Sequence, residues 1–240
     1  MPDHLLADPK TEKHTDTMKD NVSSGKQYHG CTSEMQGKRK SMEDAHQIQL
    51  NCKEDLHFMM VCDGHGGDYC AKQVAELMLP NLLEKNLVTK RSKSEDKIKK
   101  RRKSLADALK SSFLEVDKKL LALEPIANND DFSGTTVCAA FITEDEVICA
   151  NAGDTRCVLS NNKKAKVRWC DVGGVFWGGI EDVRDNTNTW LLRRQQDLSE
   201  DHKPTRKSEM ERITKAGGRV INGRVNAMHG VARSLGDFSY

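Results

Sequence analysis

The apolar run Phe58–Cys62 and the turn that follows it constrain this chain more than any other segment. The central residues of the run, 59–61, show no polar alternation, which is typical of a strand buried on both faces. Asp63 follows directly and opens the sequence Asp-Gly-His-Gly-Gly, in which Gly66 and Gly67 permit unusual backbone angles and close approach to a ligand. We therefore expect a strand that presents the Asp63 carboxylate at its carboxyl end.

The rest of the chain alternates between groups of strand-like segments and pairs of helical segments. The segment after the glycine turn, residues 68–79, has apolar side chains at helical spacing and should end or kink at Pro80. Asn222–Gly223 is typical of a two-residue hairpin turn. This grouping favours an α+β layered architecture over a parallel doubly wound sheet. The expected strands are residues 28–33, 45–50, 56–62, 135–142, 146–150, 156–160, 219–221 and 224–226, and the further helices are residues 104–120 and 205–216.

Composition limits the classes of protein to which the chain can belong. Residues 1–25 are polar and charged and are expected to form a disordered tail ahead of a domain over residues 26–240. The tail lacks the apolar centre of a signal peptide, and no stretch of about eighteen apolar residues predicts a membrane span. We expect a soluble monomer in the cytoplasm, the nucleus or both, with no membrane partner.

Charge and cysteine usage narrow the possible partners. The net charge of +2 gives no argument for nucleic-acid binding. The strongly basic run at residues 90–103 is interpreted as a solvated loop, and the alternative is a nuclear localisation signal or a docking patch for acidic partners. No aromatic residue is interleaved in it, so a nucleic-acid partner is not expected. The eight cysteines are scattered without a CxxC pair, which argues against a cysteine zinc site and agrees with reduced thiols.

Acidic residues lie at the ends of two strand-like segments. Glu43 and Asp44 directly precede the segment 45–50, and Asp63 directly follows the segment 56–62. Carboxylate oxygens are the ligands that hard cations such as Mg²⁺ and Mn²⁺ prefer. Two such cations lower the pKa of a bridging water and hold the oxygens of a phosphate. Arg39 offers a planar fork for a phosphate dianion, and His65 can protonate a leaving alkoxide. These residue types suit a metal-assisted attack on a phosphate ester.

The order of the motifs carries more weight than any motif alone. A lone Asp-Gly is most often a turn, and a lone histidine is most often structural or on the surface. That interpretation is given to His4, His14, His29, His57, His202 and His229. The segments that form a recognisable series are Arg39–His46, Val61–Gly67, Ser133–Thr136, Asn151–Arg156, Leu198–Val220 and Arg224–Asp237. In this order they resemble the protein phosphatase 2C family, the metal-dependent Ser/Thr phosphatases, over most of residues 28–240.

The resemblance implies a fold and a metal site. The fold is a central antiparallel β-sandwich flanked by helices, with a two-metal cleft at one end. In the family pattern Asp63 bridges two Mg²⁺ or Mn²⁺ ions, and Gly64 contributes its backbone carbonyl. Glu43 and Asp44 belong to the metal–water shell. Asp154 corresponds to an acidic residue associated with a third, weaker metal in some members.

The resemblance also implies a reaction, the direct hydrolysis of phosphoserine or phosphothreonine in proteins by a metal-bound hydroxide without a phosphoenzyme. Arg39 would hold the phosphate, and His65 would act as the general acid. Ser133 and Thr135 are structural in this pattern rather than nucleophiles. Phosphorylated proteins are therefore the expected substrates.

The chain departs from the family pattern at its end. Members continue past the segment that matches Leu235–Asp237 into two further motifs, each of which supplies a metal carboxylate, and this sequence stops at Tyr240. We therefore expect a domain that is incomplete at the C-terminus, with weakened metal binding and impaired activity. The alternative is a catalytically silent phosphatase-like module that binds phosphoproteins.

A second departure is the segment 167–196, which intervenes where the family has a short turn. A loop of this length is uncommon in a compact domain. One interpretation is a natural surface insertion or flap. The other is a translated retained intron, because Val167–Arg168 and Gln196 can be encoded by splice-site-like codons and removal of the segment restores a family-like sequence.

Overall fold

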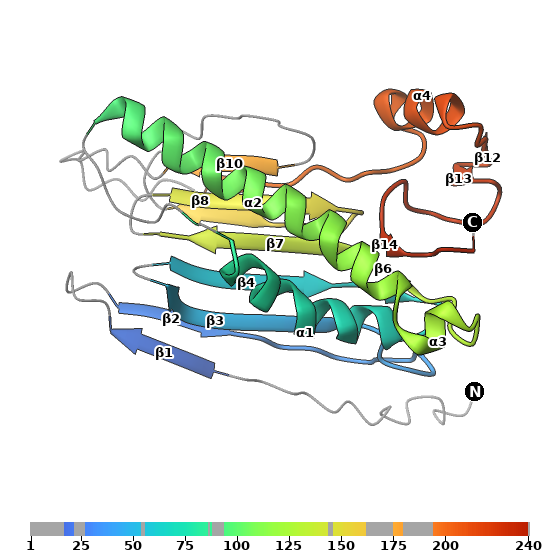
Figure 1. Cartoon of the computed structure of the whole chain (residues 1–240), viewed down its shortest axis with the longest axis horizontal. Coiled ribbons are helices and arrows are strands. Elements are labelled where there is room, and N and C mark those ends of the chain that lie inside the picture. The colour runs from blue at the N-terminus through green and yellow to red at the C-terminus, as the bar shows by residue number, and fades with distance from the viewer. Residues whose placement is uncertain are drawn as a thin grey trace, which may run out of the picture.

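A five-stranded antiparallel sheet forms the centre of the fold, with strands in the order β10-β8-β7-β4-β3 (Figure 1). The structure is a computed structural model, and it describes residues 17–21, 27–53, 56–85, 87, 94–143, 146–161, 175–179 and 194–239. The strands are β3 (Ala45–Lys53), β4 (Leu56–Cys62), β7 (Val137–Ile142), β8 (Glu146–Ala152) and β10 (Val175–Gly179). The antiparallel pairing and the mixture of helices and sheets confirm the predicted α+β class.

Two helices, α1 (Tyr69–Leu83) and α2 (Glu95–Leu121), pack together across one face of this sheet (Figure 1). The core between the layers centres on Phe58 of β4 and Phe141 of β7, which are fully buried with ring centroids 5.5 Å apart. Burial of a side chain of this size contributes about 1.5–3 kcal/mol to stability. No described helix is long and apolar enough to cross a membrane.

Helix α1 continues past Pro80, where the sequence predicts an end or a kink. Leu79 and Leu82 on either side of the proline are both buried in the core. Their packing stabilises the last turn, and it outweighs the hydrogen bond that a proline removes from the helix.

Strand β4 is covered less evenly than its unbroken apolar run suggests. Phe58, Met60 and Cys62 are buried, whereas the side chain of Val61 is 45% exposed. The helices cover one face of the strand, and the other face is open near its carboxyl end. The expectation of burial on both faces is therefore wrong for Val61, which lies just before the candidate site.

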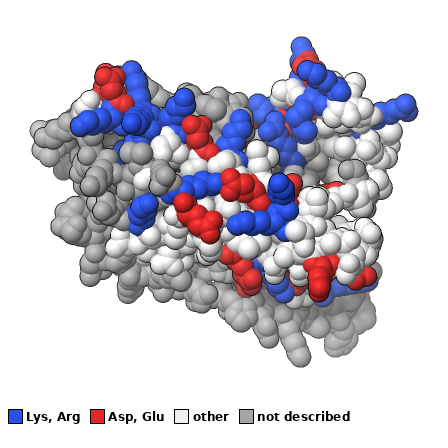
Figure 2. Space-filling model, in the orientation of Figure 1, with Lys and Arg blue, Asp and Glu red and all other residues white. Residues whose placement is uncertain are grey.

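The basic run at residues 90–103 is not a loop in its described part, since α2 begins at Glu95 rather than after Ser104. Glu95 and Asp96 in the first turn interact favourably with the positive end of the helix dipole. Arg101 and Leu105 are buried, so this part of the helix is docked on the sheet. The other basic side chains gather on the surface around its first turns (Figure 2). A role in nuclear localisation or in docking stays a prediction.

Strands form inside two segments that the sequence analysis treats as irregular, the expected tail 1–25 and the insertion 167–196. Strand β1 (Thr17–Asn21) pairs with β2 (Gln27–Cys31), so a strand lies inside the range 1–25 that is predicted as a disordered tail. Within the segment 167–196, β10 adds an edge strand to β8. Strand β11 (Arg194–Asp197) pairs with β9 (Val158–Asn161). The other residues of the insertion lie outside the described part of the chain, and both interpretations of it stay open.

Three short strands bring distant parts of the chain together at one end of the main sheet. They are β5 (Gly64–His65), β6 (Gly134–Thr135) and β14 (Leu235–Gly236), in the order β14-β6-β5. The short helix α3 (Glu124–Ala127) precedes β6. Strands β12 (Val220–Ile221) and β13 (Arg224–Val225) form the predicted hairpin, with positive φ angles at both turn residues, Asn222 and Gly223.

A buried ionic cluster holds helix α4 (Lys207–Lys215) to the chain that leads into β14. The Glu209 carboxylate is almost fully buried, and Arg233 donates to both of its oxygens at 2.7 and 3.0 Å. Arg212 donates to Glu209 Oε2 at 3.1 Å. Burial alone would raise the pKa of Glu209, but the two arginines outweigh it and lower that pKa below its ordinary value. The ion pairs therefore fix the position of the segment that carries β14.

We predict that Glu209→Gln lowers the free energy of unfolding by roughly 2–3 kcal/mol at pH 7, because it removes charge-assisted hydrogen bonds inside the protein. The lowered pKa means that the ionic contribution is present above the unfolded-state pKa and is lost as the pH falls through the folded-state value. The difference from wild type should therefore shrink toward pH 4. Urea unfolding of both proteins across that range, with the exposed Glu211→Gln as the matched control, measures it. A pH-independent difference would contradict the assignment.

Candidate active site

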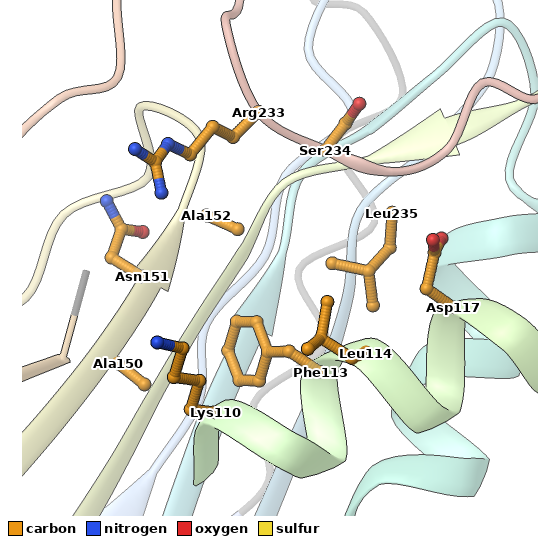
Figure 3. A pocket seen from close by; sticks show the side chains of 10 residues that line it. All are labelled: Lys110, Phe113, Leu114, Asp117, Ala150, Asn151, Ala152, Arg233, Ser234 and Leu235. Carbon is orange, nitrogen blue, oxygen red and sulfur yellow. The ribbon is translucent and has the colours of Figure 1, made fainter. Parts of the chain in front are cut away.

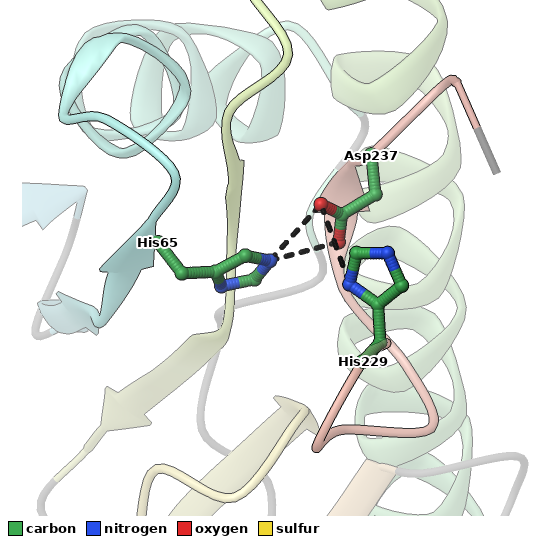
Figure 4. A group of neighbouring side chains, drawn as sticks. All are labelled: His65, His229 and Asp237. Atoms are coloured by element: carbon green, nitrogen blue, oxygen red, sulfur yellow. Dashed lines mark hydrogen bonds and ion pairs between the residues drawn. The ribbon is translucent and has the colours of Figure 1, made fainter. Parts of the chain in front are cut away.

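The candidate site forms where β5, β6 and β14 meet, and it pairs His65 with Asp237. The His65 Nε2 atom lies 3.0 and 2.9 Å from the two oxygens of the Asp237 carboxylate, although the residues are 172 positions apart (Figure 4). His65 is opposite Gly134 in the strand register, and Gly236 is opposite the same glycine from the other side. A Cβ atom on Gly134 would lie 2.3 Å from Asp237 Oδ1. Only glycine at this position lets the carboxylate reach the imidazole.

The hydrogen bond to Asp237 raises the pKa of His65 above its ordinary value. Burial opposes this shift, while the negative charges of Asp237 and Asp63 add to it. Burial also acts to raise the pKa of Asp237, but its hydrogen bonds with His65 and Ser234 lower it overall. The Ser234 hydroxyl donates to Asp237 Oδ2 at 2.5 Å and orients the carboxylate. The hydrogen bond to Asp237 therefore holds the His65 ring in place and shifts its pKa upward.

The backbone of Asp63 is locked immediately after β4. Its N–H donates to Thr136 Oγ1 at 3.2 Å, and the N–H of Thr136 donates back to the Asp63 carbonyl at 3.0 Å. Thr136 Oγ1 also lies 2.5 Å from Thr155 Oγ1, which ties in the loop that carries Asp154. The Asp63 side chain remains exposed, as the sequence predicts for a strand-end carboxylate.

Close packing of backbone against backbone places the upstream acidic cluster beside the glycine turn. A Cβ atom on Gly64 would lie only 2.1 Å from the backbone oxygen of Glu43. Glu43 is half-buried, and its side chain accepts a hydrogen bond from Ser41 at 3.1 Å. The glycine at position 64 therefore lets the segment with Glu43 and Asp44 approach the turn that carries Asp63.

Two carboxylates of the site, Asp44 and Asp63, have a raised pKa. The pKa of Asp63 is raised first by partial burial and then by the charges of Asp154 and Glu43. The pKa of Asp44 is raised by partial burial and by the charge of Asp63. Arg39 lowers the pKa of both aspartates, but it does not cancel these effects. The four carboxylates thus share one electrostatic environment in which negative charge is in excess.

The loop with Asp154 is anchored by a buried histidine. His202 Nδ1 accepts a hydrogen bond from the backbone N–H of Gly153 at 3.1 Å. The backbone N–H of His202 donates to the Gly153 carbonyl at 2.9 Å. The carboxylate of Asp154 forms an ion pair with the Lys203 ammonium group. His202 is 2% exposed and has a structural position, in agreement with the prediction for that histidine.

The donor set fits divalent metal ions of the hard class. Glu43, Asp44, Asp63 and Asp154 supply carboxylate oxygens, and the raised pKa of Asp44 and of Asp63 marks a place where a cation relieves repulsion. The Gly64 backbone is close to the same group. Mg²⁺ and Mn²⁺ prefer such oxygen ligands, so these residues can hold them.

Arg39 and His65 both lower the pKa of Asp63, and Arg39 also lowers the pKa of Asp44. The individual role of each residue stays a prediction. Ser133 makes structural contacts, accepting from the N–H of Cys70 at 3.0 Å and donating to Asp131. Sequence reasoning did not assign Asp237 to the site and took His229 as structural or surface. Both lie in the recognisable segment Arg224–Asp237, but spacing along the chain does not show that they meet His65, which is 172 positions from Asp237.

A cavity of about 230 Å³ lies behind the site, between α2, β8 and the segment that leads into β14 (Figure 3). Phe113 and Leu114 of α2 and Leu235 line its apolar side. Asp117 lies at the other end, where its Oδ1 atom accepts a hydrogen bond from the N–H of Gly236 at 2.9 Å. Helix α2 thereby helps to position β14 and the carboxylate that follows it.

Comparison with known sequences identifies related proteins. The sequence profile described as Protein phosphatase 2C matches residues 28–240. Protein phosphatase 2C homolog 3 of Schizosaccharomyces pombe is 35% identical over 242 residues, which cover 98% of this chain and 46% of that protein. Protein phosphatase 2C 1 of Paramecium tetraurelia is 32% identical over 244 residues, which cover 98% of this chain and 66% of that protein. The chain therefore spans between about half and two thirds of these relatives.

Solved structures share the fold. A serine-threonine phosphatase 2C from Toxoplasma gondii matches with a TM-score of 0.62 and 17% identity, over 95% of this chain and 68% of that one. A sex determining protein of C. elegans matches with a TM-score of 0.59 and 20% identity, over 95% of this chain and 45% of that one. The predicted fold class is thus confirmed. Because the family profile covers nearly the whole described domain, the chain belongs to the protein phosphatase 2C family.

Proposed function

We propose that this protein hydrolyses phosphoserine and phosphothreonine in proteins with the help of Mg²⁺ or Mn²⁺. The observation that carries the proposal is the grouping of four carboxylates beside one arginine and one histidine, in a chain of the protein phosphatase 2C family. Asp63, Glu43, Asp44 and Asp154 would hold the cations, together with the Gly64 carbonyl. When bound, the cations supply the Lewis acidity that makes a water nucleophilic at neutral pH.

Arg39 would hold the phosphate dianion. Its guanidinium group is exposed, so an incoming phosphoprotein can reach it. A planar guanidinium pairs with two phosphate oxygens at once, which orients the phosphorus for attack as well as binding it.

His65 would protonate the leaving serine or threonine oxygen. Its Nε2 proton is held by Asp237, so the second proton of the imidazolium is carried on Nδ1. Transfer of the Nδ1 proton leaves a neutral ring in the tautomer that Asp237 already stabilises. Asp237 is therefore a positioning residue, in the same physical sense as the carboxylate that orients a catalytic histidine in hydrolases.

A second candidate function is the binding of phosphoproteins without turnover. The observation that favours it is the ion pair between Asp154 and Lys203, since one carboxylate of the set already has a protein cation. Both candidates need Arg39, but only hydrolysis needs the bound cations to activate water. Metal-dependent turnover separates them.

We expect the 240-residue chain to release phosphate from a phosphothreonine peptide only when Mn²⁺ or Mg²⁺ is present. Asp63→Asn should reduce turnover by at least about a hundredfold, because loss of even an outer orienting group costs about 10–100-fold at metal sites. Asp68→Asn is the matched control, since this nearby aspartate pairs with Lys72 on the surface. Absence of metal-dependent turnover from folded wild-type protein would favour the binding module instead.

Asp237→Asn should slow hydrolysis of a phosphothreonine peptide by about 10–100-fold, because a well-placed general acid contributes about 10²–10⁴-fold. The same variant should hydrolyse p-nitrophenyl phosphate at nearly the wild-type rate, since that leaving group needs no proton. Steady-state rates on both substrates measure the split. Asp130→Asn, an exposed aspartate after α3, serves as the control. Equal losses on the two substrates would show that Asp237 acts on something other than the acid.

A further inference from the structure

Three cysteines from separate segments meet on the face of the main sheet that points away from α1 and α2. Cys138 of β7 and Cys149 of β8 lie on this face with their sulfur atoms 3.7 Å apart. Cys157, which directly precedes β9, packs against the same small apolar cluster. All three thiols are free. The proposed hydrolysis uses none of them.

The strand pattern explains why these thiols face one another. Along β7, Ala139 and Phe141 belong to the core under the helices, so Cys138 points to the opposite face. In the register of β7 with β8, Cys138 is opposite Asn151, which places Cys149 diagonally beside it on the same face. The sheet therefore fixes two of the three sulfur atoms next to each other.

The chain around β9 and β11 brings the third thiol to this pair. The N–H of Leu198 donates to the Cys157 carbonyl at 2.8 Å, and the N–H of Cys157 donates to Ser199 Oγ at 2.8 Å. The buried Ser199 side chain also forms a hydrogen bond with the Cys138 thiol. One serine thus contacts both cysteines, and Cys138 is the neighbour best placed to react with Cys157.

The three thiols differ in reactivity. Hydrogen bonds with Cys138 and Cys149 lower the pKa of Cys157 below its ordinary value, although burial opposes this shift. Hydrogen bonds with Cys138 and Cys157 raise the pKa of Cys149, and burial adds to that effect. The thiolate is the form that reacts with oxidants. Cys157 is also half-buried, whereas the other two are buried, so it combines thiolate character with access from solvent.

We propose that Cys157 is a site of reversible oxidation by hydroperoxides, and that the product is a disulfide with Cys138. The Cys157 sulfur attacks one peroxide oxygen, the O–O bond breaks, and the leaving oxygen takes a proton to become water or an alcohol. The Cys138 sulfur then attacks the sulfenic acid, loses its proton and releases the sulfenic oxygen as water. Two thiols are oxidised and one peroxide is reduced. A thiol reductant reverses the change.

The disulfide acts on the carboxylate cluster from both of its ends. Cys157 lies three residues after Asp154, and Cys138 lies two residues after Thr136, which holds the backbone of Asp63. The sulfur atoms of a disulfide are about 2.0 Å apart, so the two segments must move toward each other when the bond forms. Displacement of outer groups costs about 10–100-fold at metal sites, and we expect metal-dependent turnover to fall by about tenfold or more. This loss rests on the proposed function, whereas the disulfide does not.

The disulfide is measured on the full chain without reference to activity. Reduced protein is treated with hydrogen peroxide, the remaining thiols are blocked, and peptide mass spectrometry locates the cross-link. A Cys138–Cys157 disulfide that dithiothreitol removes is the expected result. Cys31→Ser, which removes an exposed thiol, is the matched control and should form the same cross-link in the same yield.

Three variants assign the roles of the thiols. Cys138→Ser should stop at the sulfenic acid of Cys157, which dimedone labels, while Cys157→Ser should give neither the label nor a cross-link to Cys138. Cys149→Ser should still form the Cys138–Cys157 disulfide. A Cys149–Cys157 cross-link in the wild-type protein, or no cross-link at all to Cys157, would overturn the site. Because that criterion uses the wild-type chain, it holds even where a variant folds poorly.

Inhibition is measured separately, as Mn²⁺-dependent hydrolysis of a phosphothreonine peptide after the peroxide has been removed. Turnover of the wild-type protein should fall by about tenfold or more and return with dithiothreitol, whereas Cys157→Ser should keep the rate of its reduced form. An equal loss in Cys157→Ser would place the damage elsewhere and refute the inhibition. If no reduced form shows turnover, the proposed function fails, while the mapped cross-link still decides the disulfide.

Discussion

The contact between Gly134 and the Asp237 carboxylate is the constraint on which the rest of the site depends. There is no room for a side chain at position 134, because a Cβ atom would lie 2.3–2.5 Å from three atoms of that carboxylate. The glycine is the centre of the small β14-β6-β5 sheet, so it sets the separation of both neighbouring strands. His65 and Asp237 meet at hydrogen-bonding distance because the residue of β6 that lies between them, Gly134, has no side chain.

A second close contact, between Gly64 and the backbone of Glu43, brings like charges together. Folding places Asp44 and Asp63 where burial and neighbouring negative charges raise their pKa, which is unfavourable unless a cation joins them. The backbone hydrogen bonds of Asp63 with Thr136 and the packing at Gly64 hold this arrangement without the cation. The apolar core beneath, with Phe58 and Phe141, supplies the stability that offsets the repulsion.

The sequence predicted those parts of the fold and site that depend on local patterns. The strand before Asp63, the following helix and the Asn222–Gly223 hairpin were all predicted, because apolar periodicity and turn chemistry are short-range properties. The start of α2 was not, because the burial of Arg101 and Leu105 depends on tertiary packing. Asp237 and His229 could not be placed in the site, because their contacts with it are set by the pairing of β6 with β14 rather than by spacing along the chain.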